Sequence, residues 1–183
     1  MRGLASKSSS WGKLIFKDRI MKVNSKTKVV LFLESWVIND KKIGKYKDWE
    51  SMVVTEAAGK VCFAQSSPIL QKPKSNSKRE AKLFIAFRPA DQIINEVSVT
   101  GGYEFNSNTV TAQSGKNKFK FDIKEQGFAW IADDKIEFRM IKRMKKGSRI
   151  MITGYNQKGS QTIDHYSLLG FTKAYNSSKK ACN

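Results

Sequence analysis

Short apolar or alternating runs recur along the chain from Trp49 onward, and they constrain its fold more than any other feature. Runs of this length, separated by turn residues such as Gly101-Gly102 and Lys158-Gly159, are typical of an antiparallel β domain. We predict strands at Trp49–Thr55, Lys60–Ser66, Ala81–Arg88, Asn95–Thr100, Thr109–Gln113, Lys118–Ile123, Gly127–Ile131, Ser148–Tyr155 and Ser160–Tyr166. The pattern therefore predicts an all-β, antiparallel β-sandwich or barrel-like domain.

Two segments depart from the strand pattern and predict helices. In the first, Asp133 and Asp134 precede apolar residues at helical spacing, and Gly147 follows; the apolar residues are Ile136, Met140, Ile141 and Met144. In the second, near the C-terminus, the residues at helical spacing are Phe171, Ala174, Tyr175 and Ser178. Cys182 falls one turn further along the same stripe, so this last helix would present Cys182 towards the sheet.

The chain has two cysteines, Cys62 in a predicted strand and Cys182 near its last residue. In an oxidising compartment they would pair and lock the last helix onto the sheet, whereas in a reducing compartment disulfides are rare. From the residues alone, the alternative of two buried thiols that never meet stays open.

The first 45 residues read as a basic N-terminal extension, and residues 46–183 as the β domain. From Met21, three lysines precede the apolar run Val29–Leu33, which is the order of a secretory signal, but Glu34 interrupts the run. Residues 1–20 could instead form an organellar transit peptide, or the whole extension an uncleaved tail. No run approaches the roughly 20 apolar residues of a membrane-spanning helix, so we predict no transmembrane span.

The net charge of +18 comes mostly from lysine, whereas direct reading of bases favours arginine. We therefore expect the basic side chains to be solvated on the protein surface. The expected partner is an anionic surface, a glycan or an envelope component, and no specific nucleic acid is expected.

The polar stretch 71–79 predicts an exposed loop, and its basic residues are the candidate contacts: Lys72, Lys74, Lys78 and Arg79. The alternative for this loop is a solvated connector.

Catalytic and cofactor patterns are poor in this chain. Asp164, His165 and Ser167 contain the residue types of a catalytic triad, but neighbouring side chains of a strand face opposite ways. One histidine and two separated cysteines do not form a metal-ligand cluster, and the glycines match no nucleotide-binding motif. We predict no enzymatic activity, no cofactor and no metal.

The segment Lys118-Phe119-Lys120-Phe121 alternates charge and ring, which would suit stacking of single-stranded nucleic acid if both lay on one face. Alternation instead sends the phenylalanines to one face, usually the core, and the lysines to water.

An ordered series of short motifs carries a family resemblance over about residues 46–182. They are Trp49, Lys60–Ala64 with Pro68, Gly102-Tyr103, Gly127–Trp130, Met144–Gly154, Lys158–Phe171 and Ala181-Cys182. This series resembles the invasion-associated locus B family of alphaproteobacteria. The resemblance implies an exported all-β protein, periplasmic or surface-associated, linked in some pathogens to host-cell entry and without established enzymatic activity. Cys62 and Cys182 fall at cysteine positions of the family pattern, which favours the disulfide.

The function that we expect is therefore that of a non-catalytic, exported envelope or surface interaction protein, with a role in host-cell invasion or attachment. The alternative is a basic nucleic-acid-binding protein or a subunit of an organellar complex.

Overall fold

The computed structural model describes residues 39–56, 59–75 and 78–183. The signal-like segment that begins at Met21 and the basic residues 1–20 lie outside the described residues. Two antiparallel sheets form the described domain. The seven-stranded sheet has the order β1 (Asn39–Tyr46), β2 (Trp49–Glu56), β3 (Gly59–Ser66), β5 (Lys82–Arg88), β6 (Ile93–Thr100), β10 (Phe128–Trp130), β9 (Ile123–Glu125). The five-stranded sheet has the order β4 (Leu70–Lys72), β12 (Gln161–Ser167), β11 (Arg149–Tyr155), β7 (Val110–Ser114), β8 (Asn117–Phe121).

All nine predicted strands are confirmed, and of the two predicted forms the structure has the sandwich. Three further strands are β1, β4 and β9. β1 pairs with β2 along its whole length and includes residues that the sequence analysis placed in the N-terminal extension. Both predicted helices are also present, as α3 (Asp134–Met144) and α4 (Phe171–Ala181).

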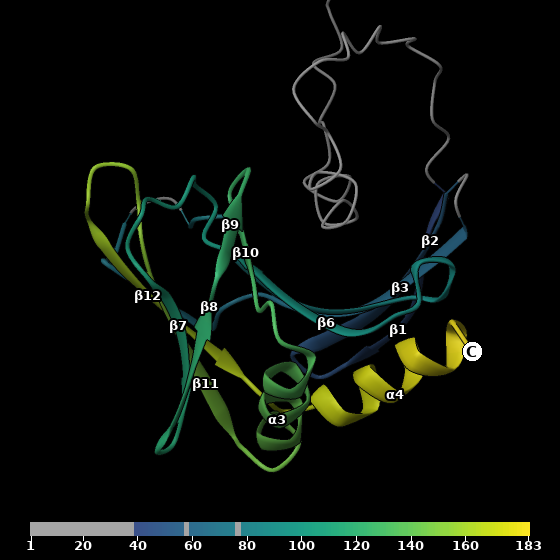
Figure 1. The fold of residues 1–183 in the computed structure, drawn as a ribbon. Coiled ribbons are helices and arrows are strands. Elements are labelled where there is room, and N and C mark those ends of the chain that lie inside the picture. Colours follow the sequence, from purple (N-terminus) through teal and green to yellow (C-terminus); the bar gives the residue numbers. More distant parts are fainter. Residues whose placement is uncertain (1–38, 57–58, 76–77) are drawn as a thin grey trace, which may run out of the picture. The chain divides into compact units, whose positions relative to one another are not determined.

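One buried apolar cluster joins the two sheets and both helices. Ile85 and Val97 of the seven-stranded sheet and Phe121 and Ile152 of the five-stranded sheet belong to it, as does Met140 of α3. α3 lies beside β6, and α4 runs along β1, β2 and β3 (Figure 1). The helices thus pack into the same core that the two sheets enclose.

The first turn of α3 is fixed by two carboxylates. The side chain of Asp133 caps the helix, because its Oδ1 accepts hydrogen bonds from the backbone N–H groups of Lys135, at 2.7 Å, and Ile136, at 3.2 Å. Glu137 is buried, and its Oε1 accepts a hydrogen bond from the N–H of Val97 in β6 at 2.7 Å. These contacts set the position of α3 relative to the seven-stranded sheet.

Replacing the capping residue, Asp133→Ala, is expected to lower the free energy of unfolding by about 1 kcal/mol. The reason is that two backbone donors of the first helical turn lose their acceptor. Urea unfolding at neutral pH measures the change. Asp134→Ala is the matched control, since it removes the same charge one residue later without removing the cap, and an equal loss in both variants would contradict the capping role.

α4 is held to the seven-stranded sheet by rings, a hydroxyl pair and a covalent bond. Phe171 packs on Trp49 with ring centroids 4.7 Å apart, and the Ser178 hydroxyl lies 2.7 Å from that of Ser51 in β2. Cys182 forms a disulfide with Cys62 of β3, with Cα atoms 5.8 Å apart. The predicted pairing of the two cysteines is confirmed.

Gly170 precedes α4 and allows the chain to turn there. Its φ is +90°, and a Cβ at this position would lie 1.8 Å from the carbonyl oxygen of Tyr46. Only glycine fits this close contact between the backbones of residues 170 and 46, because any side chain would overlap the backbone at the end of β1.

Candidate functional site

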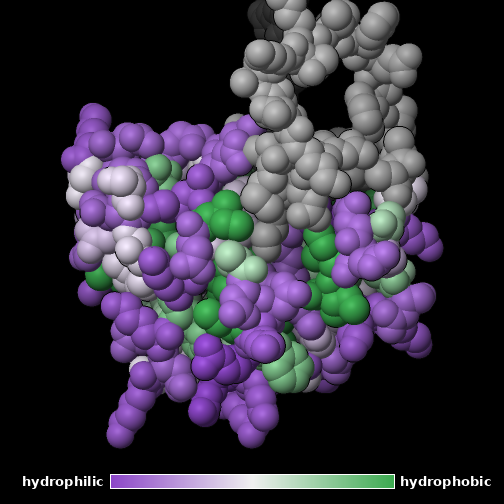
Figure 2. All heavy atoms as spheres, viewed as in Figure 1, coloured by the Kyte–Doolittle hydropathy of each residue, from purple (hydrophilic) through white to green (hydrophobic). Residues whose placement is uncertain are grey.

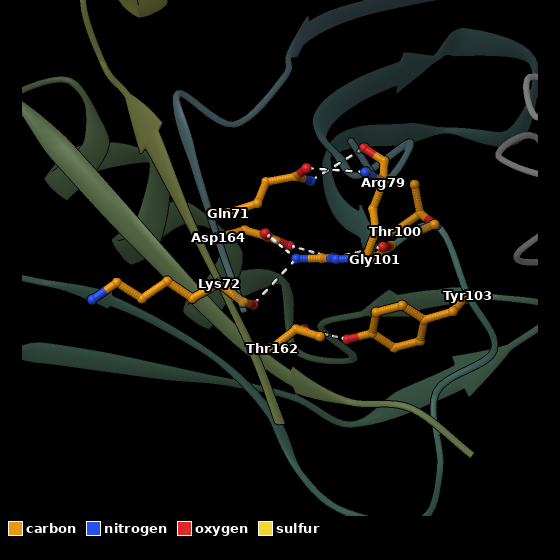
Figure 3. Close-up of polar contacts among 9 residues, drawn as sticks. Gln71, Lys72, Arg79, Thr100, Gly101, Tyr103, Thr162 and Asp164 are labelled. Carbon is orange, nitrogen blue, oxygen red and sulfur yellow. Dashed lines mark hydrogen bonds and ion pairs between the residues drawn. The ribbon is translucent and has the colours of Figure 1, made fainter. Parts of the chain in front are cut away.

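The stretch 71–79, which the sequence analysis predicted as an exposed loop, begins inside a strand, because Gln71 and Lys72 are the last residues of β4. The rest of it leads towards β5, and one amide side chain anchors its base. The side-chain Oε1 of Gln71 accepts a hydrogen bond from the backbone N–H of Arg79 at 3.0 Å, and its Nε2 donates to the backbone carbonyl of Arg79 at 3.1 Å. Figure 3 shows this pairing, which mimics a pair of strand hydrogen bonds across eight residues of chain.

Arg79 points inward from the loop and binds Asp164 of β12 with both ends of its guanidinium group. Nη2 lies 2.5 Å from Oδ1, and Nη1 lies 3.1 Å from Oδ2 (Figure 3). Nη1 also donates to the carbonyl of Gly101 at 2.8 Å. The side chain of Asp164 is 4% exposed and that of Arg79 21%, so this is a largely buried, two-pronged ion pair.

Two hydroxyl residues complete the cluster beneath Arg79. The guanidinium carbon lies 5.6 Å from the centre of the Tyr103 ring, and the Tyr103 hydroxyl is hydrogen-bonded to that of Thr162 (Figure 3). Burial raises the pKa of Asp164 above its ordinary value, while the hydrogen bonds and the charge of Arg79 act to lower it. The cluster therefore holds the base of the loop through an ion pair whose carboxylate is costly to bury.

The four predicted contact residues have different environments. Lys72, Lys74 and Lys78 are exposed, and the last two line a small pocket of about 230 Å³ under the loop. Arg79 lines the same pocket but directs its charge to Asp164. The loop thus presents lysines to solvent on a base that Arg79 holds, and their contact with an anionic partner stays a prediction.

Asp164, His165 and Ser167 all lie on β12 but contact different partners. Asp164 directs both oxygens to Arg79, and the Ser167 hydroxyl accepts a hydrogen bond from the N–H of Leu169 at 3.2 Å. His165 is half-buried, and burial together with nearby Arg149 and Lys72 lowers its pKa. The geometry assigns Asp164 and Ser167 to contacts within the fold rather than to a shared reaction centre.

A basic groove, which the sequence analysis did not find, lies between α3 and the β7–β8 hairpin. It has a volume of about 860 Å³ and is lined by Lys116, Lys118 and Lys120 of the hairpin and by Arg139, Lys142, Arg143 and Lys146 in and just after α3. Figure 2 shows hydrophilic side chains gathered over α3 and over the neighbouring ends of β7, β8 and β11. As predicted, Phe119 and Phe121 point into the core while Lys118 and Lys120 face water.

The sequence signal for this groove is the spacing of its helical cations. Positions 139, 142, 143 and 146 follow the i, i+3, i+4, i+7 pattern. The first three share one side of α3, and Lys146 follows in the turn just after the helix. The sequence analysis followed only the apolar stripe of this helix, and it had no means of placing the helix beside β8.

The fold and the sites define a class of protein. It is a two-sheet β domain with a lysine-rich surface, in which a disulfide links strand β3 to the end of the last helix, α4. In the part of the chain that the structure describes, neither helix is long and apolar enough to cross a membrane. Residues 49–179 match the family model described as invasion associated locus B (IalB) protein, and the chain belongs to this family. Neither a curated protein nor a solved structure was found to match it.

Proposed function

We propose that this protein is an exported, non-catalytic interaction protein of the bacterial envelope or surface, which takes part in host-cell invasion or attachment. Family membership is consistent with an invasion-associated surface protein. The observation that carries the export part of the proposal is the Cys62–Cys182 disulfide, because disulfides form and persist in oxidising compartments such as the periplasm.

The lysine-rich surface supports binding to an anionic partner. Lys72 at the end of β4 and Lys74 and Lys78 in the anchored loop are exposed, and seven further cations line the basic groove. Exposed charges of one sign raise the local concentration of oppositely charged ligands and speed their association. The non-catalytic part of the proposal is supported by Asp164, whose carboxylate is committed to Arg79.

Fractionation of cells that produce the full chain tests the export part. We expect the protein in the periplasmic or surface fraction, with both Cys62 and Cys182 resistant to thiol labelling until a reductant is added. Sequencing of the N-terminus of the mature protein provides the second readout. Recovery from the cytoplasm with two labelled thiols and an intact Met1 would overturn the proposal.

A further inference from the structure

The cations of the basic groove form two rows on two different elements. Arg139, Lys142 and Arg143 lie along one side of α3, over a length of about 6 Å at 1.5 Å per residue, and Lys146 follows in the turn after the helix. Lys118 and Lys120 share one face of β8, about 7 Å apart along the strand. A linear ligand lying in the groove would therefore meet a cation at several points along its length.

Most of this charge is not neutralised within the described part of the domain. Lys120 has an acidic neighbour, Asp122, with Nζ and Oδ1 3.7 Å apart, while the other six cations have no ion pair with a described residue. The acidic residues of α3 lie in its first turn, at the opposite end from Arg143 and Lys146, and Glu137 points to β6. Crowded cations repel one another, so a bound anion would relieve that repulsion.

A second depression, of about 840 Å³, continues from the groove across the outer face of the five-stranded sheet and shares Lys118 and Lys120 with it. Its remaining lining is rich in hydroxyl and amide groups, from Thr111, Gln113, Thr153 and Gln161 among others. Thr111 pairs with Lys120 on one side and with Thr153 on the other, so cation and hydroxyls lie in one row across the strands.

Tyr155 adds a ring to this second depression. Its side chain is partly exposed, and its hydroxyl accepts a hydrogen bond from Nε2 of Gln161 at 2.8 Å, which fixes the ring beside the hydroxyl row. Tyrosine offers an apolar face together with a polar tip, which suits contact with a sugar ring and its hydroxyls. The two depressions thus place ionic, hydroxyl and ring contacts side by side.

We propose that the basic groove and the adjoining hydroxyl-rich depression form one binding site for a linear polysaccharide that carries carboxylate or sulfate groups. Such a ligand has anionic groups for the lysines and arginines and hydroxyls for the threonines and amides. The inference rests on the proposed interaction function and names its partner class and its site, which is distinct from the loop of Lys72, Lys74 and Lys78.

Two other polyanions fit the same surface less well. Single-stranded nucleic acid is usually held by several exposed rings on which successive bases stack. Of the aromatic residues that line the two depressions, Phe119 is 7% exposed and belongs to the core, which leaves Tyr155 as a single ring. A flat lipid bilayer would reach the rim of a groove rather than cations on its two walls. A chain that enters the groove matches both features.

The test compares two triple variants of the full-length protein that lose the same charge. The groove variant is Arg139→Gln/Lys142→Gln/Arg143→Gln, and the loop variant is Lys72→Gln/Lys74→Gln/Lys78→Gln. Titration calorimetry at physiological salt measures binding of a heparin oligosaccharide and of polygalacturonate, with dextran as the neutral control. We expect the groove variant to bind about tenfold more weakly than the wild type, because three ionic contacts are lost, and the loop variant to bind almost as well as the wild type.

A third variant separates sugar recognition from charge alone. Tyr155→Ala leaves the charge unchanged and is expected to weaken binding of both acidic polysaccharides severalfold, while leaving weak binding of a single-stranded oligonucleotide unchanged. Urea unfolding midpoints of all three variants show whether each is folded. A folded Tyr155→Ala variant with wild-type affinity for the polysaccharides would overturn the sugar-specific part of the site.

The remaining outcomes distinguish this inference from the function on which it rests. Equal losses in the two triple variants would overturn the groove as the site, and tighter binding of the oligonucleotide or of phosphatidylglycerol vesicles than of the polysaccharides would overturn the ligand class. Either result leaves the exported interaction function standing. Cytoplasmic location with free thiols overturns that function, whatever the polysaccharides do.

Discussion

The variant Cys62→Ala/Cys182→Ala is expected to lose about 4 kcal/mol of its free energy of unfolding. The disulfide joins residues 120 positions apart, and closing a loop of that length removes much of the conformational freedom of the unfolded chain. Urea unfolding without reductant measures the loss as a lower transition midpoint. The slope of the transition should also rise, because the unfolded chain without the cross-link exposes more surface.

Reduction of the wild-type protein provides the control, since it removes the same bond without a substitution. The reduced wild type and the double variant should unfold at similar urea concentrations. α4 should remain docked in both, because Phe171 packs on Trp49 and Tyr175 on Phe87 with ring centroids 5.3 Å apart. Equal midpoints for the oxidised wild type and the double variant would show that the bond contributes little to stability.

Arg79→Met is expected to lower the free energy of unfolding by about 3 kcal/mol at neutral pH. The methionine keeps the apolar stem of Arg79 but leaves the buried Asp164 carboxylate without its two-pronged partner. Lys78→Met is the matched control, because it removes one exposed positive charge from the neighbouring position of the same loop. Chemical unfolding of both variants should show a large loss only for Arg79→Met.

The loss in Arg79→Met should depend on pH in a defined direction. Burial already raises the pKa of Asp164, and without Arg79 the main influence that lowers it is gone. The folded state then binds a proton at higher pH than the unfolded state, so the stability that protonation provides is present at low pH and is lost as the pH rises. The free energy of unfolding of Arg79→Met should therefore fall furthest below that of the wild type at neutral pH, and the gap should shrink towards a pH of about 4.

A second substitution isolates the unpaired charge as the cause. The double variant Arg79→Met/Asp164→Leu removes both ions and is expected to recover most of the stability that Arg79→Met loses. Two results would contradict the ion-pair explanation. One is a loss of unfolding free energy in Arg79→Met that is the same at every pH, and the other is a double variant that is as unstable as Arg79→Met.

The strands and helices were predictable where local pattern and burial agree. In β12, Thr162, Asp164 and Tyr166 are buried while the alternate positions Ile163 and His165 are partly exposed, which is the period-two signal of a strand. The stripe of α4 is buried as its spacing predicted. β4 and β9 were missed because three residues are too short for any period, and β1 because it is a lysine-rich edge strand without an apolar alternation.

The sites were less predictable, since each depends on residues that meet only in the folded chain. Arg79 looks like an exposed loop cation in sequence, and its partner Asp164 lies 85 residues away. The basic face of α3 was readable from its spacing, but its neighbour Lys118 comes from a different element. The cysteine pair differs, because the chain holds only two cysteines and family resemblance supplied the pairing.

The covalent ring closed by Cys62 and Cys182 also has a mechanical consequence. The groove residues between Lys116 and Lys146 all lie inside this ring. If a bound surface and the chain preceding Cys62 were pulled apart, tension on the backbone would pass through the sulfur–sulfur bond to α4 as well as through the enclosed strands. A protease cut in the exposed loop at Lys74 would likewise leave both fragments joined. A surface-binding domain of the kind proposed above would thereby resist both pulling and proteolysis.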